Sequence, residues 1–249
     1  GQRLKIPYVY QLQAFPTTRE RIFRDFPDVF SPEYRSTAAE YAKQLGSLVD
    51  DPYLIGYFLR NEPEWGFGDY NIAELLLANP KRLFCKERLI RFLAEKYNGD
   101  ATLLAGAWCY PFTAFEDLQK PISGAAGLSE IAAGDLREFT KVLIAEYIRV
   151  PAAAARQVDP NHLNLGLRWA WVASEQFYAG SQYCDVFSLN CYKLNPAPDE
   201  IKTASIATGL PVIIGEFHAG SLDAGLPSTG LRGMANQTER GKFYRWYIE

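Results

Sequence analysis

The sequence is poor in residues that usually bind metals or act as nucleophiles. Its 249 residues include only two histidines, His162 and His218, one methionine and four cysteines. The two histidines lie far apart with no carboxylate at ligand spacing, no cysteine pair has C-x-x-C spacing, and no G-x-S-x-G motif occurs. We therefore expect no metal, no cofactor, and neither a serine nor a cysteine triad.

Long apolar runs and basic runs are also missing. The longest apolar stretches fall far short of a membrane span. The formal net charge is -3 and no lysine or arginine cluster occurs, so neither nucleic acid nor a membrane is an expected partner. The cysteines are scattered, which does not indicate a disulfide scaffold and leaves the redox compartment open.

Aromatic residues, in contrast, make up 14% of the chain. Several tryptophans and tyrosines fall near the ends of expected strands. Their rings offer apolar faces with a polar tip, which suits the C–H faces and hydroxyl edges of sugars. Core packing explains many single aromatics equally well, and we expect Trp108 and Trp171 to be core residues.

Short apolar runs alternate with helical patterns along the chain. The expected strands are Ile6–Gln11, Tyr53–Asn61, His162–Arg168, Asp185–Asn190 and Pro211–Glu216. The expected helices are Pro32–Val49, Arg82–Tyr97, Ser129–Gln157, Asp199–Thr208 and Asn236–Glu249. Nearly all-apolar strands that alternate with helices predict an α/β fold with a covered parallel sheet.

An open doubly wound sheet and a (β/α)8 TIM barrel both fit this alternation. No glycine-rich turn follows an early strand, as nucleotide-binding sheets usually require. Polar or aromatic clusters instead follow four strands: Asn61-Glu62, Arg168-Trp169, Asn190-Cys191-Tyr192 and Glu216-Phe217-His218. Because TIM barrels build their active sites at the carboxyl ends of the strands, the sequence predicts a barrel. The segments Asp69–Pro80 and Pro111–Gly127 are expected to be loops beside its substrate cleft.

Glu62 and Glu216 are the strongest catalytic candidates. Each ends an apolar strand, where an unpaired charge is costly to bury. Hydrolysis of a glycosidic bond needs two carboxyl groups with different protonation states. The alternative is that each glutamate pairs with an arginine or caps a turn, which explains one such residue better than two.

Seven ordered segments make the sequence resemble a known family. Asp51-Pro52-Tyr53-Leu54-Ile55-Gly56-Tyr57-Phe58-Leu59 before Asn61-Glu62 resembles the fourth strand of clan A glycoside hydrolases, and Pro211–Gly220 (PVIIGEFHAG) resembles the seventh. The closer likeness is to the β-agarases of glycoside hydrolase family 50, with the family 42 β-galactosidases as neighbours. The further matching segments are 26–32, 96–99 with 107–108, 160–166, 222–226 and 235–242.

The resemblance implies roles for individual residues. Glu62 would be the general acid/base and Glu216 the nucleophile of a retaining enzyme. Asn61 would bind the sugar 2-hydroxyl, and Tyr192 would donate a hydrogen bond to Glu216. The remaining substrate-binding candidates are His218, Trp169, Arg168 and Trp65.

Alternative roles stay open for several of these residues. Asn61 could cap a turn, Tyr192 could be a rim aromatic, and His218 could be a structural neighbour. His162 precedes its strand and is expected to be structural. Arg60 stands where agarase-like sequences commonly carry an acid, and would either lie beside the acid/base or point outward.

Only about five of the eight strands of a barrel are found, corresponding to strands 3 to 7. We therefore expect residues 1–249 to be a catalytic barrel domain that is an internal part of a longer chain. The expected function is a retaining β-glycoside hydrolase acting on galactose-containing chains such as agarose. The alternative is a non-hydrolytic carbohydrate-binding barrel or an inactive truncated fragment. A secreted or periplasmic location is expected for a polysaccharide-degrading enzyme, and the oligomeric state is left open.

Overall fold

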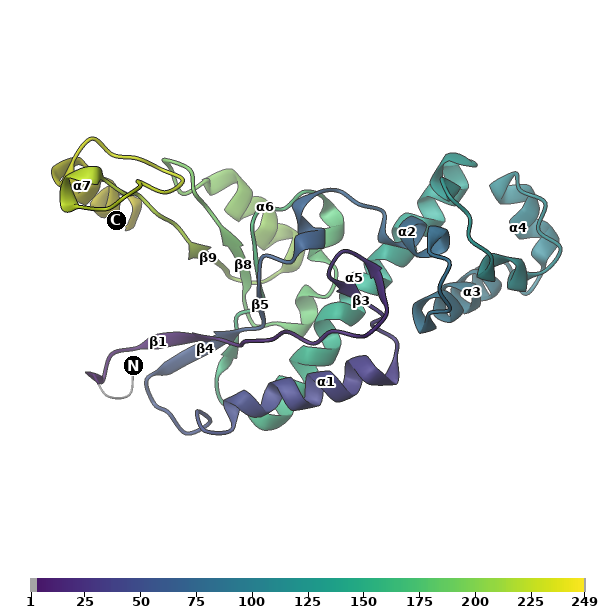
Figure 1. Cartoon of the computed structure of the whole chain (residues 1–249), viewed down its shortest axis with the longest axis horizontal. Coiled ribbons are helices and arrows are strands. Elements are labelled where there is room, and N and C mark those ends of the chain that lie inside the picture. Colours follow the sequence, from purple (N-terminus) through teal and green to yellow (C-terminus); the bar gives the residue numbers. More distant parts are fainter. Residues whose placement is uncertain (1–3, 249) are drawn as a thin grey trace.

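A parallel sheet forms the centre of the computed structural model, which describes residues 4–248 (Figure 1). Its strands are β1 (Tyr8–Gln11), β4 (Leu54–Phe58) with its continuation β5 (Arg60–Asn61), β6 (Leu163–Asn164) with its continuation β7 (Leu167–Trp169), β8 (Phe187–Asn190) and β9 (Val212–Glu216). The spatial orders are β1-β4-β6 and β5-β7-β8-β9, and every pairing in them is parallel. Strands therefore neighbour each other in chain order, as in a TIM-barrel-like domain, and the five predicted strands are confirmed.

Helices pack against one face of this sheet. They include α1 (Pro32–Ala42), α5 (Glu130–Val158) and α6 (Pro198–Thr208). Alternate strand residues, such as Leu167 and Trp169 in β7, join the helices in one large core. The opposite face holds a separate small cluster of Phe58, Leu165 and Val186. This second cluster occupies the face that carries the candidate site.

The helix α5 runs its full predicted length although Pro151 lies inside it. Proline has no N–H, so the carbonyl of Tyr147 one turn earlier loses its usual partner. The hydroxyl of Tyr34 on α1 donates to that carbonyl at 2.7 Å. Packing of α1 on α5 thus supplies the hydrogen bond that the helix lacks.

A helical lobe lies between β5 and α5 in the chain, at the right of Figure 1. It contains α2 (Ile72–Ala78), α3 (Phe84–Lys96) and α4 (Ala101–Trp108), followed by 3-10 turns at Phe115–Gln119 and Ala125–Gly127. The prediction of a loop over Asp69–Pro80 is therefore wrong where α2 forms. Asn71 caps the start of this helix, because its side-chain oxygen accepts a hydrogen bond of 3.3 Å from the backbone N–H of Glu74. The segment Pro111–Gly127 is irregular apart from its two turns, as expected.

The remaining elements are small. A short hairpin joins β2 (Arg21–Phe23) to β3 (Phe26–Pro27), and α7 (Gln237–Ile248) ends the described chain. Glu249, the last residue of the expected final helix, lies outside the described residues. All four cysteines are free. Within residues 4–248, no helix combines the length and the hydropathy that a membrane span requires.

Candidate active site

Glu62 stands where β5 ends beside β7. Its backbone N–H donates to the carbonyl of Arg168 at 2.9 Å, and its φ of 30° lies in the left-handed region. A non-glycine residue in that region costs about 1–3 kcal/mol, and such strain concentrates at functional sites. Oε1 of Glu62 accepts a hydrogen bond of 2.7 Å from Nδ2 of Asn190. The carboxylate is thereby fixed by a side chain from two strands away.

A β-bulge aims Glu216 at the same face of the sheet. In the register of β8 and β9, Leu189 pairs with Ile214 but Asn190 pairs with Glu216, so Gly215 is the extra residue. Without the bulge, Gly215 would pair with Asn190 and Glu216 would turn toward the helices. Bulges that redirect one side chain are common next to active sites.

Glycine is required at position 215. A Cβ there would lie 2.6 Å from Ser188 Oγ and 2.8 Å from Cδ of Arg168. Because position 215 carries no side chain, the Arg168 side chain has room to extend from β7 across β8 and reach Glu216 on β9. The bulge thus turns Glu216 to the inner face of the sheet, and the missing side chain at Gly215 lets Arg168 reach it.

Two groups contact the carboxylate of Glu216. Nη1 of Arg168 lies 3.1 Å from Oε1, and the hydroxyl of Tyr192 donates to Oε2. Burial and the hydrogen bond to Glu216 raise the pKa of Tyr192 to about 12, and the charge of Glu62 adds to the shift. Tyr192 therefore stays a protonated donor at any physiological pH.

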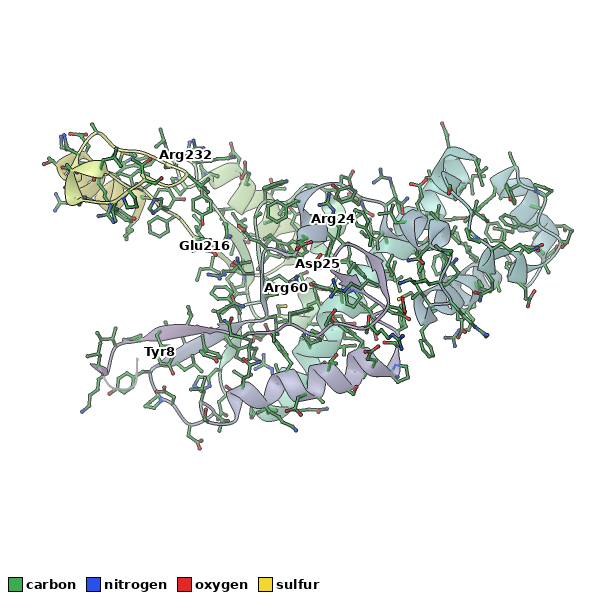
Figure 2. All side chains as sticks on the ribbon, viewed as in Figure 1. Tyr8, Arg24, Asp25, Arg60, Glu216 and Arg232 are labelled. Atoms are coloured by element: carbon green, nitrogen blue, oxygen red, sulfur yellow. The ribbon has the colours of Figure 1, made fainter. Side chains whose placement is uncertain are left out.

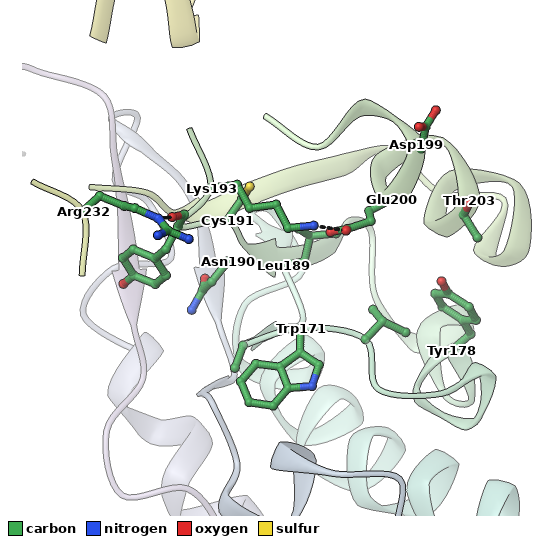
Figure 3. Close-up of a pocket in the computed structure, with 13 residues that line it drawn as sticks. Trp171, Tyr178, Leu189, Asn190, Cys191, Lys193, Asp199, Glu200, Thr203 and Arg232 are labelled. Atoms are coloured by element: carbon green, nitrogen blue, oxygen red, sulfur yellow. Dashed lines mark hydrogen bonds and ion pairs between the residues drawn. The ribbon is translucent and has the colours of Figure 1, made fainter. Parts of the chain in front are cut away.

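A cavity of about 650 Å³ opens beside this pair of glutamates (Figure 3). Its wall includes Asn190 and Tyr192 at the end of β8, Trp171 in the loop after β7, and Glu200 in α6. Among the described residues that line it, none comes from the segments Asp69–Pro80 or Pro111–Gly127. The expectation that these segments flank the substrate cleft is not met at this cavity.

The structure places some of the predicted substrate-binding residues at the site and others in the core. Arg168 and Tyr192 lie at Glu216, and Asn61 is exposed at the tip of β5. Trp65 and Trp169 are 1% and 2% exposed, with ring centroids 5.4 Å apart, so both belong to the core and cannot present a face to a sugar. The prediction of sugar contact is wrong for these two tryptophans.

His218 is held by the loop that follows β9. Its Nε2 lies 2.7 Å from the carbonyl oxygen of Thr229. Gly230 has a φ of 70°, and a Cβ there would lie 2.6 Å from the same nitrogen. The histidine is thus locked in place beside the strand that carries Glu216, with its ring half-buried.

The departure from the agarase pattern at Arg60 has a structural explanation. Arg60 points to the helix side of the sheet, where it forms an ion pair with Asp25 and donates to the hydroxyl of Tyr147 at 3.0 Å (Figure 2). Asp25 also accepts from the backbone N–H groups of Glu64 and Trp65. The pair therefore fixes the turn after Glu62 and adds no charge beside its carboxylate.

Sequence reasoning missed Trp171 and the contact of Asn190 with Glu62. Trp171 is 48% exposed, against the expectation of a core residue, whereas Trp108 is buried as expected. Trp171 follows Trp169 at a spacing of two, which in a continued strand would put both rings on one face, so the sequence carried no signal that Trp171 is exposed. Among residues 4–248, no three histidine, cysteine, aspartate or glutamate side chains gather as metal ligands would.

The geometry defines a parallel α/β sheet with two glutamates at the carboxyl ends of its strands. No family model matches the chain. The chain is 33% identical over 233 residues to β-agarase B of Vibrio sp. (strain JT0107), which covers 89% of this chain and 24% of that protein. The crystal structure of an agarase superposes with a TM-score of 0.84 at 28% identity, over 98% of this chain and 36% of the other.

The predicted resemblance to the family 50 β-agarases is thus confirmed. A β-galactosidase from the haloarchaeon Halorubrum lacusprofundi, which is 18% identical with a TM-score of 0.56 over 83% of this chain and 34% of its own, shares the fold alone. The chain spans 24% of the length of the curated relative and 36% of the solved agarase.

Proposed function

We propose that this chain carries the catalytic pair of a retaining β-glycoside hydrolase that acts on galactose-containing chains such as agarose. Two glutamates from separate strands, linked through Asn190 and Arg168, are the observation that carries the proposal. The β-agarases that the chain resembles suggest the substrate. Glu216 would be the nucleophile and Glu62 the acid/base.

The contacts of the two carboxylates support this division of roles. Glu216 faces a guanidinium and a phenol that donate to it, which suits a group that must be ionised to attack the anomeric carbon. Glu62 faces the neutral amide of Asn190, so it can carry or release a proton without losing an ion pair. Glu62 would protonate the leaving oxygen and then activate water against the glycosyl–Glu216 ester.

Only some of the remaining site residues would contact the sugar directly. Asn61, exposed beside Glu62, would hydrogen-bond the 2-hydroxyl, and His218 would border the ring held at Glu216. Arg168 would act on the sugar only through Glu216, because its guanidinium is occupied there. Trp65 and Trp169 would support the site from beneath, through ring contacts with each other.

A retaining mechanism needs the two carboxyl groups about 5–5.5 Å apart. Three strand steps separate β5 from β9, which is roughly 14 Å in a flat sheet. Curvature of the sheet would bring the side chains together on the concave face. In support, Asn190 pairs with Glu216 in the register of β8 and β9 and also contacts Glu62. The charges of both glutamates contribute to the raised pKa of Tyr192.

We also propose that the strands correspond to strands 3 to 7 of an eight-stranded barrel. Val9, Leu163 and Ile213 lie on the inner face of the sheet and are 42%, 43% and 37% exposed. Further strands would cover these side chains in a closed barrel. The β1 and β9 edges are both left without a second neighbour in the described sheet.

The test is the stereochemistry and the residue dependence of hydrolysis. Agarose oligosaccharides are incubated with the wild type, Glu216→Ala and Glu62→Ala, and the first anomer released is identified by proton NMR. We expect net retention in the wild type and a loss of about 10³-fold or more in each variant. Inversion of the anomeric centre, or turnover in Glu216→Ala equal to the wild type, would reject the mechanism.

The exposed inner face favours one second candidate, a carbohydrate-binding fragment without hydrolytic activity. Apolar side chains that would lie inside a closed barrel are open here, which would weaken the fixed positions of the catalytic pair. Such a chain would bind agarose oligosaccharides but release no sugar from them. Binding without turnover in the wild type, unchanged by Glu216→Ala, would favour this candidate.

A further inference from the structure

We propose that Asp25 is a positioning residue, which holds Glu62 in the backbone conformation that acid/base catalysis needs. This inference rests on the proposed glycoside hydrolase function. Asp25 lies in the turn of the β2–β3 hairpin, outside the sheet that carries both glutamates. Its carboxylate contacts the chain just before and just after Glu62. It acts on the reaction through Glu62 and not through the sugar.

The backbone at Glu62 needs support from its surroundings. Its φ of 30° lies in the left-handed region, where a non-glycine residue stays only if neighbouring contacts fix it. Pro63 has no N–H, so the first backbone donors after Glu62 belong to Glu64 and Trp65. These two N–H groups begin the 3-10 turn Glu64–Phe67, which Pro63 does not cap with its side chain. Such N-terminal donors have no acceptor within the turn itself.

Asp25 supplies the missing acceptors. Its Oδ2 accepts from the N–H of Glu64 at 2.9 Å, and its Oδ1 accepts from the N–H of Trp65 at 3.0 Å. Oδ2 also pairs with the guanidinium of Arg60, which precedes Glu62 by two residues on β5 (Figure 2). The side chains of Asp25 and Arg60 are 13% and 21% exposed, so water and salt screen the pair only weakly. One carboxylate therefore fixes both flanks of Glu62.

The rest of the hairpin turn is anchored to the same segment. Nη1 of Arg24 donates to the carbonyl of Glu64 at 3.0 Å, and the ring of Phe26 packs against that of Trp65 with centroids 5.0 Å apart. Three consecutive hairpin residues, 24–26, thus contact the turn that follows Glu62. Because its neighbours hold the hairpin in place, Asp25 presents its carboxylate from a fixed position.

Loss of the Asp25 contacts should misplace the carboxyl group of Glu62. The strained φ of Glu62 could then relax, and a displacement of about 1 Å is enough to cost roughly 100-fold in rate. In the proposed mechanism Glu62 protonates the leaving oxygen, so the defect should fall on substrates whose leaving group needs that proton. Dinitrophenol is a strong enough acid to leave as its anion, whereas phenol is much weaker and depends on the proton.

Two glycosides of one agarose-derived disaccharide, with phenyl and dinitrophenyl leaving groups on its galactose end, measure this defect. The value of kcat/KM is determined for both in the wild type, Asp25→Asn and Glu62→Ala. Asp25→Asn keeps the size of the side chain but removes its charge and one acceptor oxygen. We expect it to lose about 10- to 100-fold on the phenyl glycoside and less than about threefold on the dinitrophenyl glycoside. Both values scale with the fraction of folded protein, so a loss of stability alone leaves their ratio unchanged.

Asp28→Asn is the matched control. Asp28 accepts from the backbone N–H groups of Phe84 and Cys85, each at 2.8 Å, at the start of α3. It therefore holds a helix start as Asp25 does, but in the helical lobe rather than beside Glu62 (Figure 1). Asp28→Asn should lower stability and keep the ratio of the two kcat/KM values within about twofold of the wild type.

A double variant tests whether Asp25 acts through Glu62. In the Glu62→Ala background, Asp25→Asn should cause no further loss on the phenyl glycoside, because the group that it positions is absent. Equal losses on the two glycosides, no loss in Asp25→Asn, or additive losses in the double variant would overturn the positioning role and leave the proposed function standing. If the wild type hydrolysed neither glycoside, or if Glu62→Ala kept the wild-type ratio, the proposed function would be rejected and the positioning role with it.

Discussion

Asn190 donates a hydrogen bond of 2.7 Å to Glu62, a residue 128 positions away in the chain, and sits opposite Glu216 in the register of β8 and β9. One amide on β8 therefore relates the two carboxylates that we propose to be catalytic. Its strand is buried along its whole length, so its position is fixed by packing.

Replacement of Tyr192 by phenylalanine should reduce kcat on agarose oligosaccharides by about 10- to 100-fold. The variant removes the hydroxyl that donates to Glu216, and a hydrogen bond to a charged group contributes about 1.5–3 kcal/mol. The ring is retained, so KM should change less than threefold. Steady-state kinetics measure both values. A variant that lost affinity at unchanged kcat would assign Tyr192 to substrate binding instead.

Gly215→Ala should abolish most activity and lower stability. The new methyl group would fall 2.6 Å from Ser188 Oγ and 2.8 Å from the Arg168 side chain, so Arg168 must leave Glu216 or the bulge must shift. Gly134→Ala in α5 is the control, because nothing lies within 4 Å of its new Cβ, and it should stabilise the helix by about 0.5–1 kcal/mol. Thermal unfolding and activity are compared for both. Normal activity in Gly215→Ala would contradict the proposed role of Arg168.

Arg60→Met should destabilise the protein by about 2–4 kcal/mol, because it leaves the half-buried carboxylate of Asp25 without its cation. The exposed pair Lys43–Glu40 provides the comparison, and Lys43→Met should cost less than about 0.5 kcal/mol. Urea unfolding followed by circular dichroism gives both values. Equal small losses in the two variants would show that Arg60 contributes no more than a surface charge.

His162→Gln should lower stability more at pH 5.5 than at pH 9. Both ring nitrogens face acceptors, Asp159 Oδ2 at 2.7 Å and the Asp51 carbonyl at 2.9 Å. Burial acts to lower the pKa of His162, but these contacts outweigh it and raise the pKa above the ordinary 6.5. A raised pKa means that the stabilisation is complete below about pH 6.5 and is lost as the pH rises through the folded-state pKa. Denaturation at both pH values measures the difference, and an identical loss at each would show that the protonated ring makes no contribution.

The amino-acid sequence by itself determined the elements and the catalytic candidates. Apolar runs with polar ends predicted the five strands, and helical periodicity predicted the segments that form α1 and α5. Periodicity is a local property of the chain, so it can be read without knowing which segments meet. The short helices α2 and α4 were missed because seven and eight residues make only about two turns, which is too short for a helical period to stand out.

The tertiary structure decided which side chains face the site. Trp169 and Trp171 differ by two positions in sequence, yet one packs on Phe177 in the core and the other stands in the cavity wall. The extra residue Gly215 turns Glu216 inward, and a bulge leaves no periodic signal in a five-residue strand. Which face a side chain takes depends on strand register and on the neighbours across it, and both arise only when distant segments pack together.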